Sequence, residues 1–95
     1  MEWKSNARYN QPVESGTVFE LKGSSRIAIH TVHGLGEQWY LSCYPLCIDN
    51  VPLNTEDFNT AVENAKAIIR KKLHEILDTY AVFASDASEN EIVRY

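Results

Sequence analysis

"GTVFELKGSSRIAIHTVHGLGEQWYLSCY", residues 16–44, contains three runs of alternating polar and apolar residues, separated by two turn signals. Side chains along a β-strand point to opposite faces in turn, so this alternation indicates strands with one buried face. The segments "KGSS" (22–25) and "GLGE" (34–37) supply the residues that turns favour. Sequential strands joined by short turns usually pair with each other. The stretch therefore predicts a three-stranded antiparallel meander.

The segment that follows, from Asn54 to about Ala84, is free of proline and places apolar residues at helical spacing. It predicts a helix of about 26 residues, about 39 Å long at 1.5 Å per residue. Asn54 or Thr55 is the expected N-cap, and Glu56 and Asp57 then fall in the first turn, where the helix dipole favours negative charge. The apolar positions are Phe58, Ala61, Val62, Ala65, Ile68, Ile69, Leu73, Ile76, Leu77 and Tyr80. We expect the apolar face of the sheet to cover this stripe.

The segments outside the three strands and the helix show no clear periodic pattern. Residues 1–15 are polar and predict an irregular N-terminal arm that Trp3 pins to the domain. Between the sheet and the helix, Pro45 and Pro52 limit regular strand pairing, because proline cannot donate to a ladder. An irregular connection is therefore expected there.

The predicted fold class is α+β, with a three-stranded antiparallel β-meander packed against one long C-terminal helix. Residues 16–84 form the single domain of this fold. Residues 85–95 form an acidic tail, in which "EIVRY" (91–95) either adds an edge strand or remains disordered.

Length and composition restrict the class of protein. A chain of 95 residues suits one domain, and a domain of this size buries roughly 60–65% of its unfolded surface. The net charge of −4 is not that of a general nucleic-acid binder. No stretch approaches the ~20 apolar residues of a membrane span, and the first residues lack the apolar core of a signal peptide. We therefore expect a cytoplasmic protein without membrane contact, whose two cysteines are free thiols.

Two histidines and two cysteines lie close together in "HTVHGLGEQWYLSCYPLC" (residues 30–47). They are His30, His33, Cys43 and Cys47, in the pattern H-x2-H-x9-C-x3-C. The odd separation of the histidines places them on opposite faces of a strand, and Cys43 falls on the expected core face. Zinc knuckles usually use paired C-x2-C spacing. We therefore favour a hairpin with a buried thiol and expect no cofactor. The alternative is a metal site formed by these four residues.

Catalysis by these residues is a further alternative, in the form of a small metal- or cysteine-dependent enzyme. Cys47 is the better candidate nucleophile, but nothing in the sequence brings a histidine within hydrogen-bond reach of it. Asp49, Glu56 and Asp57 are acids of the kind that hold magnesium in nucleases, but the two helix-start acids are explained by the helix dipole. We therefore expect no enzymatic activity.

"KAIIRKKLH" (residues 66–74) is a cluster of basic residues on the predicted helix. Lys66, Arg70 and Lys71 are the candidate phosphate contacts if the protein binds nucleic acid. Acidic residues nearby in the helix favour a solvated face with intrahelical ion pairs instead. Nucleic-acid binding is therefore the alternative function and not the expected one.

Protein binding is the function that the residues favour. Tyr40 and Tyr44, with His30, are assigned to the second face of the sheet, which becomes a candidate interface if no helix covers it. Tyrosine is common at interfaces because it combines apolar area with a polar tip. Glu56 and Asp57, at the acidic helix start, form the second candidate contact. A free sheet edge also offers a route to a homodimer.

The order of elements in residues 26–77 resembles the HicB-type antitoxin family. In that family, a hairpin ends in an aromatic and hydrophobic strand, a proline and often a cysteine follow, and a helix opens with acids and repeats alanines. The residues that fit this outline are Trp39, Leu41, Pro45, Cys47, Thr55, Ala61 and Ala65. The resemblance implies a non-catalytic domain that grips another protein, as an inhibitor or accessory factor. Small acidic inhibitors carried by phages and mobile elements have a similar composition.

Overall fold

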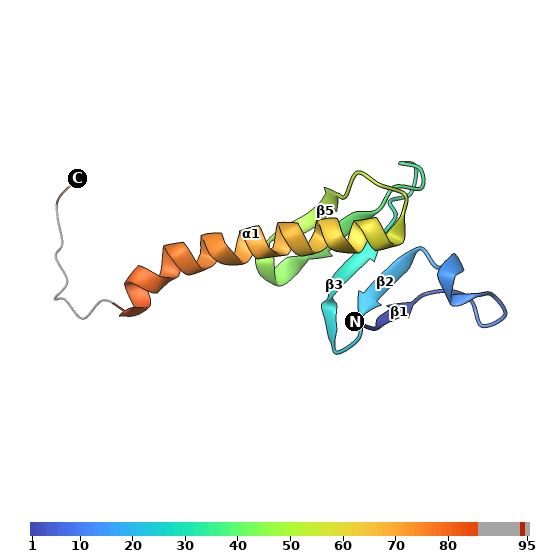
Figure 1. The fold of residues 1–95 in the computed structure, drawn as a ribbon, viewed down its shortest axis with the longest axis horizontal. Coiled ribbons are helices and arrows are strands. Elements are labelled where there is room, and N and C mark those ends of the chain that lie inside the picture. Colours follow the sequence, from blue (N-terminus) through green and yellow to red (C-terminus); the bar gives the residue numbers. More distant parts are fainter. Residues whose placement is uncertain (86–93, 95) are drawn as a thin grey trace.

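The computed structural model describes residues 1–85 and Arg94, and shows an antiparallel sheet with one long helix on one of its faces (Figure 1). The elements are β1 (Trp3–Ser5), η1 (Val13–Ser15), β2 (Val18–Leu21), β3 (Ser24–His30), β4 (Tyr40–Cys43), η2 (Tyr44–Leu46), β5 (Ile48–Pro52) and α1 (Phe58–Ser85). The strand order is β1-β2-β3-β4-β5, and every neighbouring pair is antiparallel. The α+β class with a C-terminal helix is confirmed, but the prediction of three strands is wrong, because β1 and β5 add one strand to each edge.

Strand β1 lies in the segment that we predicted to be irregular. It pairs with β2, and the residue that follows it, Asn6, accepts the backbone N–H groups of Thr17 and Val18 on its Oδ1 atom, at 2.8 and 3.0 Å. A side chain thus extends a ladder that three backbone residues alone would hold weakly. Trp3 packs edge-to-face against Phe58, with ring centroids 5.9 Å apart. Trp3 therefore anchors this segment, as predicted.

Strand β5 also replaces a predicted irregular segment. Pro45 lies in the short helix η2, outside the sheet, and Pro52 is the last residue of an edge strand, where a missing donor costs least. The pairing of β4 with β5 shifts register between Leu41 and Cys43, and Cys47 and Asn50 have positive φ angles of 57° and 49°. These irregularities allow a strand to form around the prolines.

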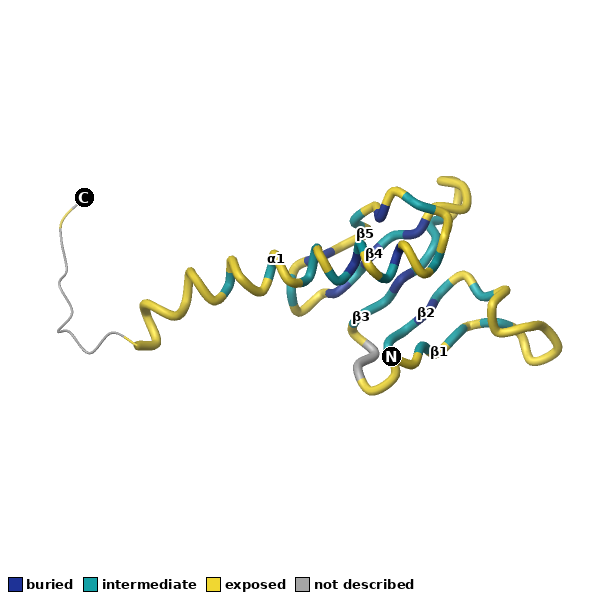
Figure 2. The backbone as a smooth tube through the Cα atoms, viewed as in Figure 1, coloured by how far each residue is buried: buried dark blue, intermediate teal, exposed yellow. Residues whose placement is uncertain are grey.

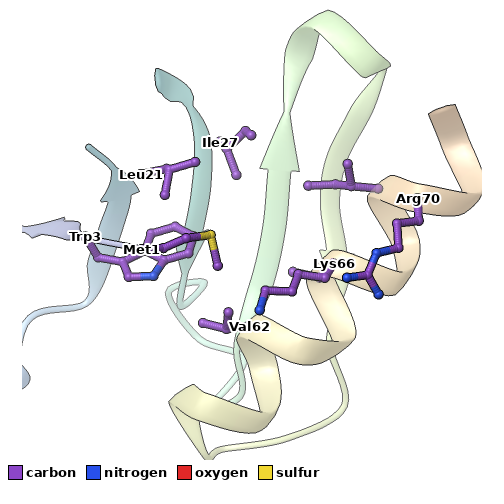
Figure 3. Close-up of a pocket in the computed structure, with 9 residues that line it drawn as sticks. Met1, Trp3, Leu21, Ile27, Val62, Lys66 and Arg70 are labelled. Atoms are coloured by element: carbon purple, nitrogen blue, oxygen red, sulfur yellow. The ribbon is translucent and has the colours of Figure 1, made fainter. Parts of the chain in front are cut away.

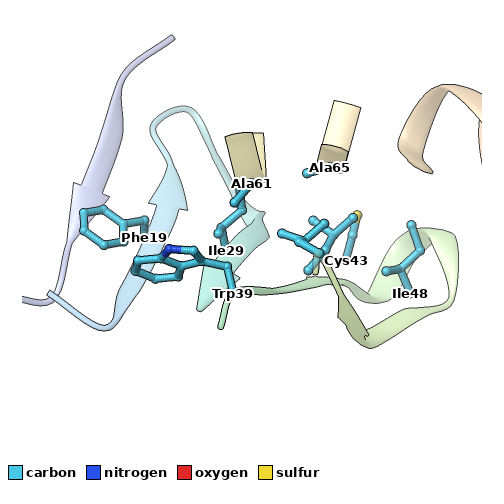
Figure 4. Close-up of a cluster of buried hydrophobic side chains, with 9 residues drawn as sticks. Phe19, Ile29, Trp39, Cys43, Ile48, Ala61 and Ala65 are labelled. Atoms are coloured by element: carbon cyan, nitrogen blue, oxygen red, sulfur yellow. The ribbon is translucent and has the colours of Figure 1, made fainter. Parts of the chain in front are cut away.

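The core lies between the sheet and the first half of α1 (Figure 4). Ile29 and Leu41 are fully buried, and Cys43 is buried beside them, as predicted. Ala61 and Ala65 are the buried residues of α1, and their small side chains let the helix approach the strands closely. The described core residues are Phe19, Ile29, Trp39, Leu41, Cys43, Ile48, Leu53, Ala61 and Ala65.

The second half of α1 extends beyond the sheet (Figures 1 and 2). The helix has 28 residues, which span about 42 Å, whereas strands of four to seven residues span about 13–23 Å. We predicted that the sheet covers the whole apolar stripe, and this is wrong, because the helix is longer than the face it packs on. No helix within residues 1–85 has both the length and the apolar character needed to cross a membrane.

Residues 86–93 and 95 lie outside the described residues, and with them most of the predicted acidic tail and the possible strand at 91–95. The domain boundaries 1–15, 16–84 and 85–95 therefore remain predictions.

The helix begins later than predicted, and Asp57 is its N-cap in place of Asn54 or Thr55. The prediction that Glu56 and Asp57 lie in the first turn is therefore wrong, because both precede Phe58, the first residue of α1. The Oδ2 atom of Asp57 accepts the backbone N–H of Thr60 at 2.8 Å and its hydroxyl at 2.7 Å. Thr60 is the third helical residue, which is the usual partner of an N-cap side chain. These hydrogen bonds, the one from the Thr60 side chain first, hold the pKa of Asp57 below its ordinary value.

The lowered pKa of Asp57 predicts a pH dependence of stability. The ionised carboxylate stabilises the fold above the unfolded-state pKa of about 3.9, and this contribution is lost as the pH falls through the lower folded-state pKa. We expect Asp57→Ala to lower the Tm by a few degrees at neutral pH. The difference from the wild type should disappear in acid, which thermal unfolding at a series of pH values will show. Asp49→Ala, which removes an exposed carboxylate that caps no helix, is the control. A Tm difference that persists in acid would contradict the role of the charge.

Candidate functional site

The projecting half of α1 carries large apolar side chains on one side. Leu73, Leu77, Tyr80 and Phe83 are 45%, 62%, 63% and 85% exposed. Their separations of four, three and three residues keep them on one face of the helix, and half-buried Ile76 lies among them. We call Leu73, Ile76, Leu77, Tyr80 and Phe83 the helix stripe. Exposed apolar side chains that gather in this way indicate an interaction surface, unlike single scattered ones.

An apolar groove of about 230 Å³ lies between the packed half of α1 and strands β1, β2 and β3 (Figure 3). Its lining residues are Met1, Trp3, Leu21, Ile27, Val62, Ala65, Lys66, Ile69 and Arg70. Strand β1, which the sequence pattern did not predict, therefore supplies one wall of the groove. Val62, Lys66 and Ile69 precede Leu73 by eleven, seven and four residues, which are close to whole helical turns. The groove and the helix stripe thus form one continuous surface along α1.

Charge is divided along α1. Residues 62–72 of α1 contain four basic side chains and one acidic, whereas residues 73–85 contain two acidic side chains and no lysine or arginine. The acid of the first segment, Glu63, forms an ion pair with Lys66 at 3.0 Å. Lys66 and Arg70 lie at the helix side of the groove (Figure 3). The surface is therefore basic beside the groove, whereas Glu75 and Asp78 lie on the side of α1 opposite the helix stripe.

The second face of the sheet is not covered by α1 and carries two of the predicted partner-binding residues. Ile29 and Leu41 point into the core, so their neighbours His30 and Tyr40 point to the opposite face. These two residues are register partners, and their rings stack with centroids 6.4 Å apart. The prediction that they share one face is confirmed.

A serine and a histidine are also hydrogen-bonded on this face. His30 Nε2 lies 2.8 Å from Ser42 Oγ, and His30 Nδ1 lies 3.0 Å from the carbonyl oxygen of Thr31. A proton on Nδ1 would leave Nε2 free to accept from the hydroxyl, as in a nucleophile and base pair. However, Ser42 Oγ also accepts the N–H of Asn50 at 3.1 Å. That bond joins β5 to β4, so we assign the network a role in fixing the pairing of these two strands.

The other predicted partner-binding residues lie elsewhere. Tyr44 is exposed at the start of η2. Glu56 has an exposed side chain, and its carbonyl oxygen accepts the indole N–H of Trp39 at 2.8 Å. Asp57 caps α1, so the acidic helix start lies on the helix side of the sheet, away from the face that carries His30. The predicted residues therefore belong to more than one surface.

The four alternative metal ligands are not brought together. Cys43 is buried in the core, Cys47 is exposed, and His30 points to the other face of the sheet. His33 lies in the exposed β3–β4 loop. Among the residues that the structure describes, no group of three or more His, Cys, Asp and Glu side chains is placed to hold a metal ion.

No protein-family model, no curated protein and no solved structure matches this chain. The groove, the helix stripe and the open sheet face are the candidate functional surfaces of the described residues. Leu73, Ile76, Leu77 and Tyr80 were recognised in the sequence as apolar positions of the helix, but Phe83 was not, and the exposure of the stripe was missed. The lengths of the predicted elements already indicated this exposure, because a helix of about 39 Å is much longer than strands of four to eight residues.

Proposed function

We propose that the protein is a non-enzymatic protein-interaction domain that holds its partner through the helix stripe and the adjoining groove. The observation that carries this proposal is the exposure of Leu73, Leu77, Tyr80 and Phe83 on one side of the half of α1 that no other described element covers. A helix that presents residues at intervals of three and four is a recurring mode of recognition between proteins. The sheet and the packed half of α1 serve as the base from which this helix projects.

The charges and thiols are consistent with this function. Lys66 and Arg70, the candidate nucleic-acid contacts, border an apolar groove, and Lys66 is paired with Glu63. Such an environment suits a protein chain better than a phosphate backbone. The free thiols of Cys43 and Cys47 suit a reducing cytoplasm. The resemblance to HicB-type antitoxins implies that the domain acts as an inhibitor or accessory factor of its partner.

The test is affinity capture with the full-length protein from a nuclease-treated lysate of the native host, quantified by mass spectrometry. The bait variants are Leu77→Glu on the stripe, Val82→Glu on the opposite side of the same helix half, and Tyr40→Ala on the sheet face. We expect a stoichiometric partner that Val82→Glu and Tyr40→Ala retain and that Leu77→Glu loses at least about tenfold, because a buried carboxylate without a partner is costly. Equal capture by all four baits would reject the helix stripe as the interface.

A further inference from the structure

A second cavity, of about 320 Å³, lies where strands β1 and β2 meet the start of α1. Four aromatic side chains from separate parts of the chain line it: Trp3 of β1, Phe19 of β2, Trp39 just before β4, and Phe58, the first residue of α1. Phe19 and Trp39 lie together at one end of the buried cluster (Figure 4). We call this cavity the aromatic pocket. No residue of the helix stripe lines it, so the proposed function leaves it unassigned.

The rings of the aromatic pocket stand at steep angles to one another. Trp3 and Trp39 each contact Phe58 edge-to-face, with interplanar angles of 83° and 71° and ring centroids 5.9 and 5.4 Å apart. Phe19 meets Trp39 at 71°. Rings in this arrangement form walls and not one flat stack, so a group held among them contacts ring faces as well as edges. The face of an aromatic ring carries partial negative charge and attracts cations.

The charges around the aromatic pocket also favour a cation. Among the described residues that line it, Glu14 is the one acid, and none is a lysine, an arginine or a histidine. Phe58 starts α1, and the helix dipole places about half a positive charge there. Glu56 and Asp57 directly precede Phe58, and each carries a full negative charge, so the helix start remains negative. The pocket therefore combines aromatic walls with acidic surroundings.

The hydrogen-bonding groups of the pocket distinguish between kinds of cation. The hydroxyl of Ser5 donates to the carbonyl oxygen of Val13 at 2.7 Å and accepts the N–H of Ala7 at 3.1 Å, so it is already engaged. Glu14 and Asn59 are exposed at the rim. An ammonium or guanidinium group among the rings would bury N–H donors without acceptors, which is costly. A quaternary ammonium group has no N–H donor and avoids this cost.

We propose that the aromatic pocket binds a quaternary ammonium group of the choline type. A cavity of about 150 Å³ holds benzene, so the pocket has room for a trimethylammonium head and the start of the chain that carries it. The rings contact the methyl groups, over which the positive charge is spread, and the carboxylate of Glu14 attracts the same charge from the rim.

The first experiment titrates the full-length protein with choline chloride at constant ionic strength and follows tryptophan fluorescence. Both tryptophans of the chain line the pocket, so their emission reports its occupancy. The matched control ligand is the uncharged isostere of choline, in which a carbon atom replaces the nitrogen. We expect a saturable change with choline and an affinity at least about tenfold weaker for the isostere, because only choline gains the cation–π contacts. Equal affinity for the two ligands would overturn the proposal.

Two variants locate the site, with affinities measured by calorimetry and folding checked by circular dichroism. Trp3→Leu keeps an apolar side chain but removes one aromatic wall. The dissociation constant for choline should therefore rise about tenfold, while that for the isostere changes little. Glu14→Gln, at an exposed position, should weaken choline binding about threefold. Glu75→Gln, the same change on the projecting half of α1, should have no effect. Wild-type affinity in both Trp3→Leu and Glu14→Gln would overturn the assignment to this pocket.

A peptide that contains trimethyllysine, compared with choline, separates the two sources of such a group. Tighter binding of the peptide would identify a modified side chain of a protein, and tighter binding of choline would identify a small molecule. Failure of both cations to bind would overturn the proposal. Leu77→Glu, on the helix stripe, should leave choline binding unchanged, so this proposal and the proposed function can fail separately.

Discussion

Trp39→Ala is expected to lower the free energy of unfolding by about 3–5 kcal/mol, the usual loss for a buried tryptophan. The indole ring packs edge-to-face against Phe19 and Phe58, with centroids 5.6 and 5.4 Å away, so it joins β2 to the start of α1. Its N–H donates to the carbonyl of Glu56 at 2.8 Å, just before the helix begins. Small domains are stable by about 5–15 kcal/mol in total. The variant should therefore be marginally folded, as urea unfolding will show.

Two further variants separate the contributions of this ring. Trp39→Phe keeps an aromatic ring but removes the N–H donor, so its loss should be smaller, about 1–3 kcal/mol for the unpaired Glu56 carbonyl and the altered packing. Trp3→Ala removes a half-buried indole that contacts Phe58 at the sheet edge. If Trp3→Ala proved as costly as Trp39→Ala, the assignment of Trp39 to the centre of the core would be wrong.

Leu41→Ala is the second substitution with a large expected effect, a loss of about 2–5 kcal/mol in the free energy of unfolding. Leu41 is fully buried and pairs with Ile29 on β3 and Val51 on β5, so its side chain lies in the middle of the sheet. Neighbouring strands hold the backbone in place, so the cavity left by the smaller side chain cannot collapse easily. Chemical denaturation of the purified variant measures this loss.

Leu35→Ala provides the matched control for Leu41→Ala. It makes the same chemical change at an exposed position in the β3–β4 loop. We expect a change within about 0.5 kcal/mol, as is usual for surface positions. Similar losses in the two variants would mean that burial does not set the cost at position 41.

The central strands and the helix could be predicted from the sequence because their patterns are long and regular. Alternation around Phe19, Ile29 and Leu41 identified β2, β3 and β4, and the same alternation placed Cys43 in the core. The edge strands could not be predicted in this way. β1 is short and depends on the side chain of Asn6, which contacts residues more than ten positions away. β5 contains Pro52 and a positive φ at Asn50, features that normally argue against a strand.

The candidate site was predicted only in part, because periodicity reports which residues are apolar and not what covers them. Leu73, Leu77 and Tyr80 were recognised as one face of a helix, yet the sheet ends before reaching them. The groove could not be foreseen, since one of its lining residues, Trp3, belongs to a strand that the pattern did not reveal, and another, Met1, lies just before that strand. His30 and Tyr40 were placed together correctly because residues across a hairpin follow from strand register.

The five strands lie in the sheet in the same order in which they occur along the chain, which affects the kinetics of folding. Each strand pairs only with its neighbours in the sequence, so the contact order of the sheet is low and each loop closure costs little entropy. The hairpins can form one after another as the polypeptide leaves the ribosome. Because α1 is synthesised after β5, the apolar side of the sheet stays open to solvent until the helix emerges and docks through Ala61 and Ala65. The nascent chain is thus most exposed to aggregation in the interval between the completion of the sheet and the arrival of the helix.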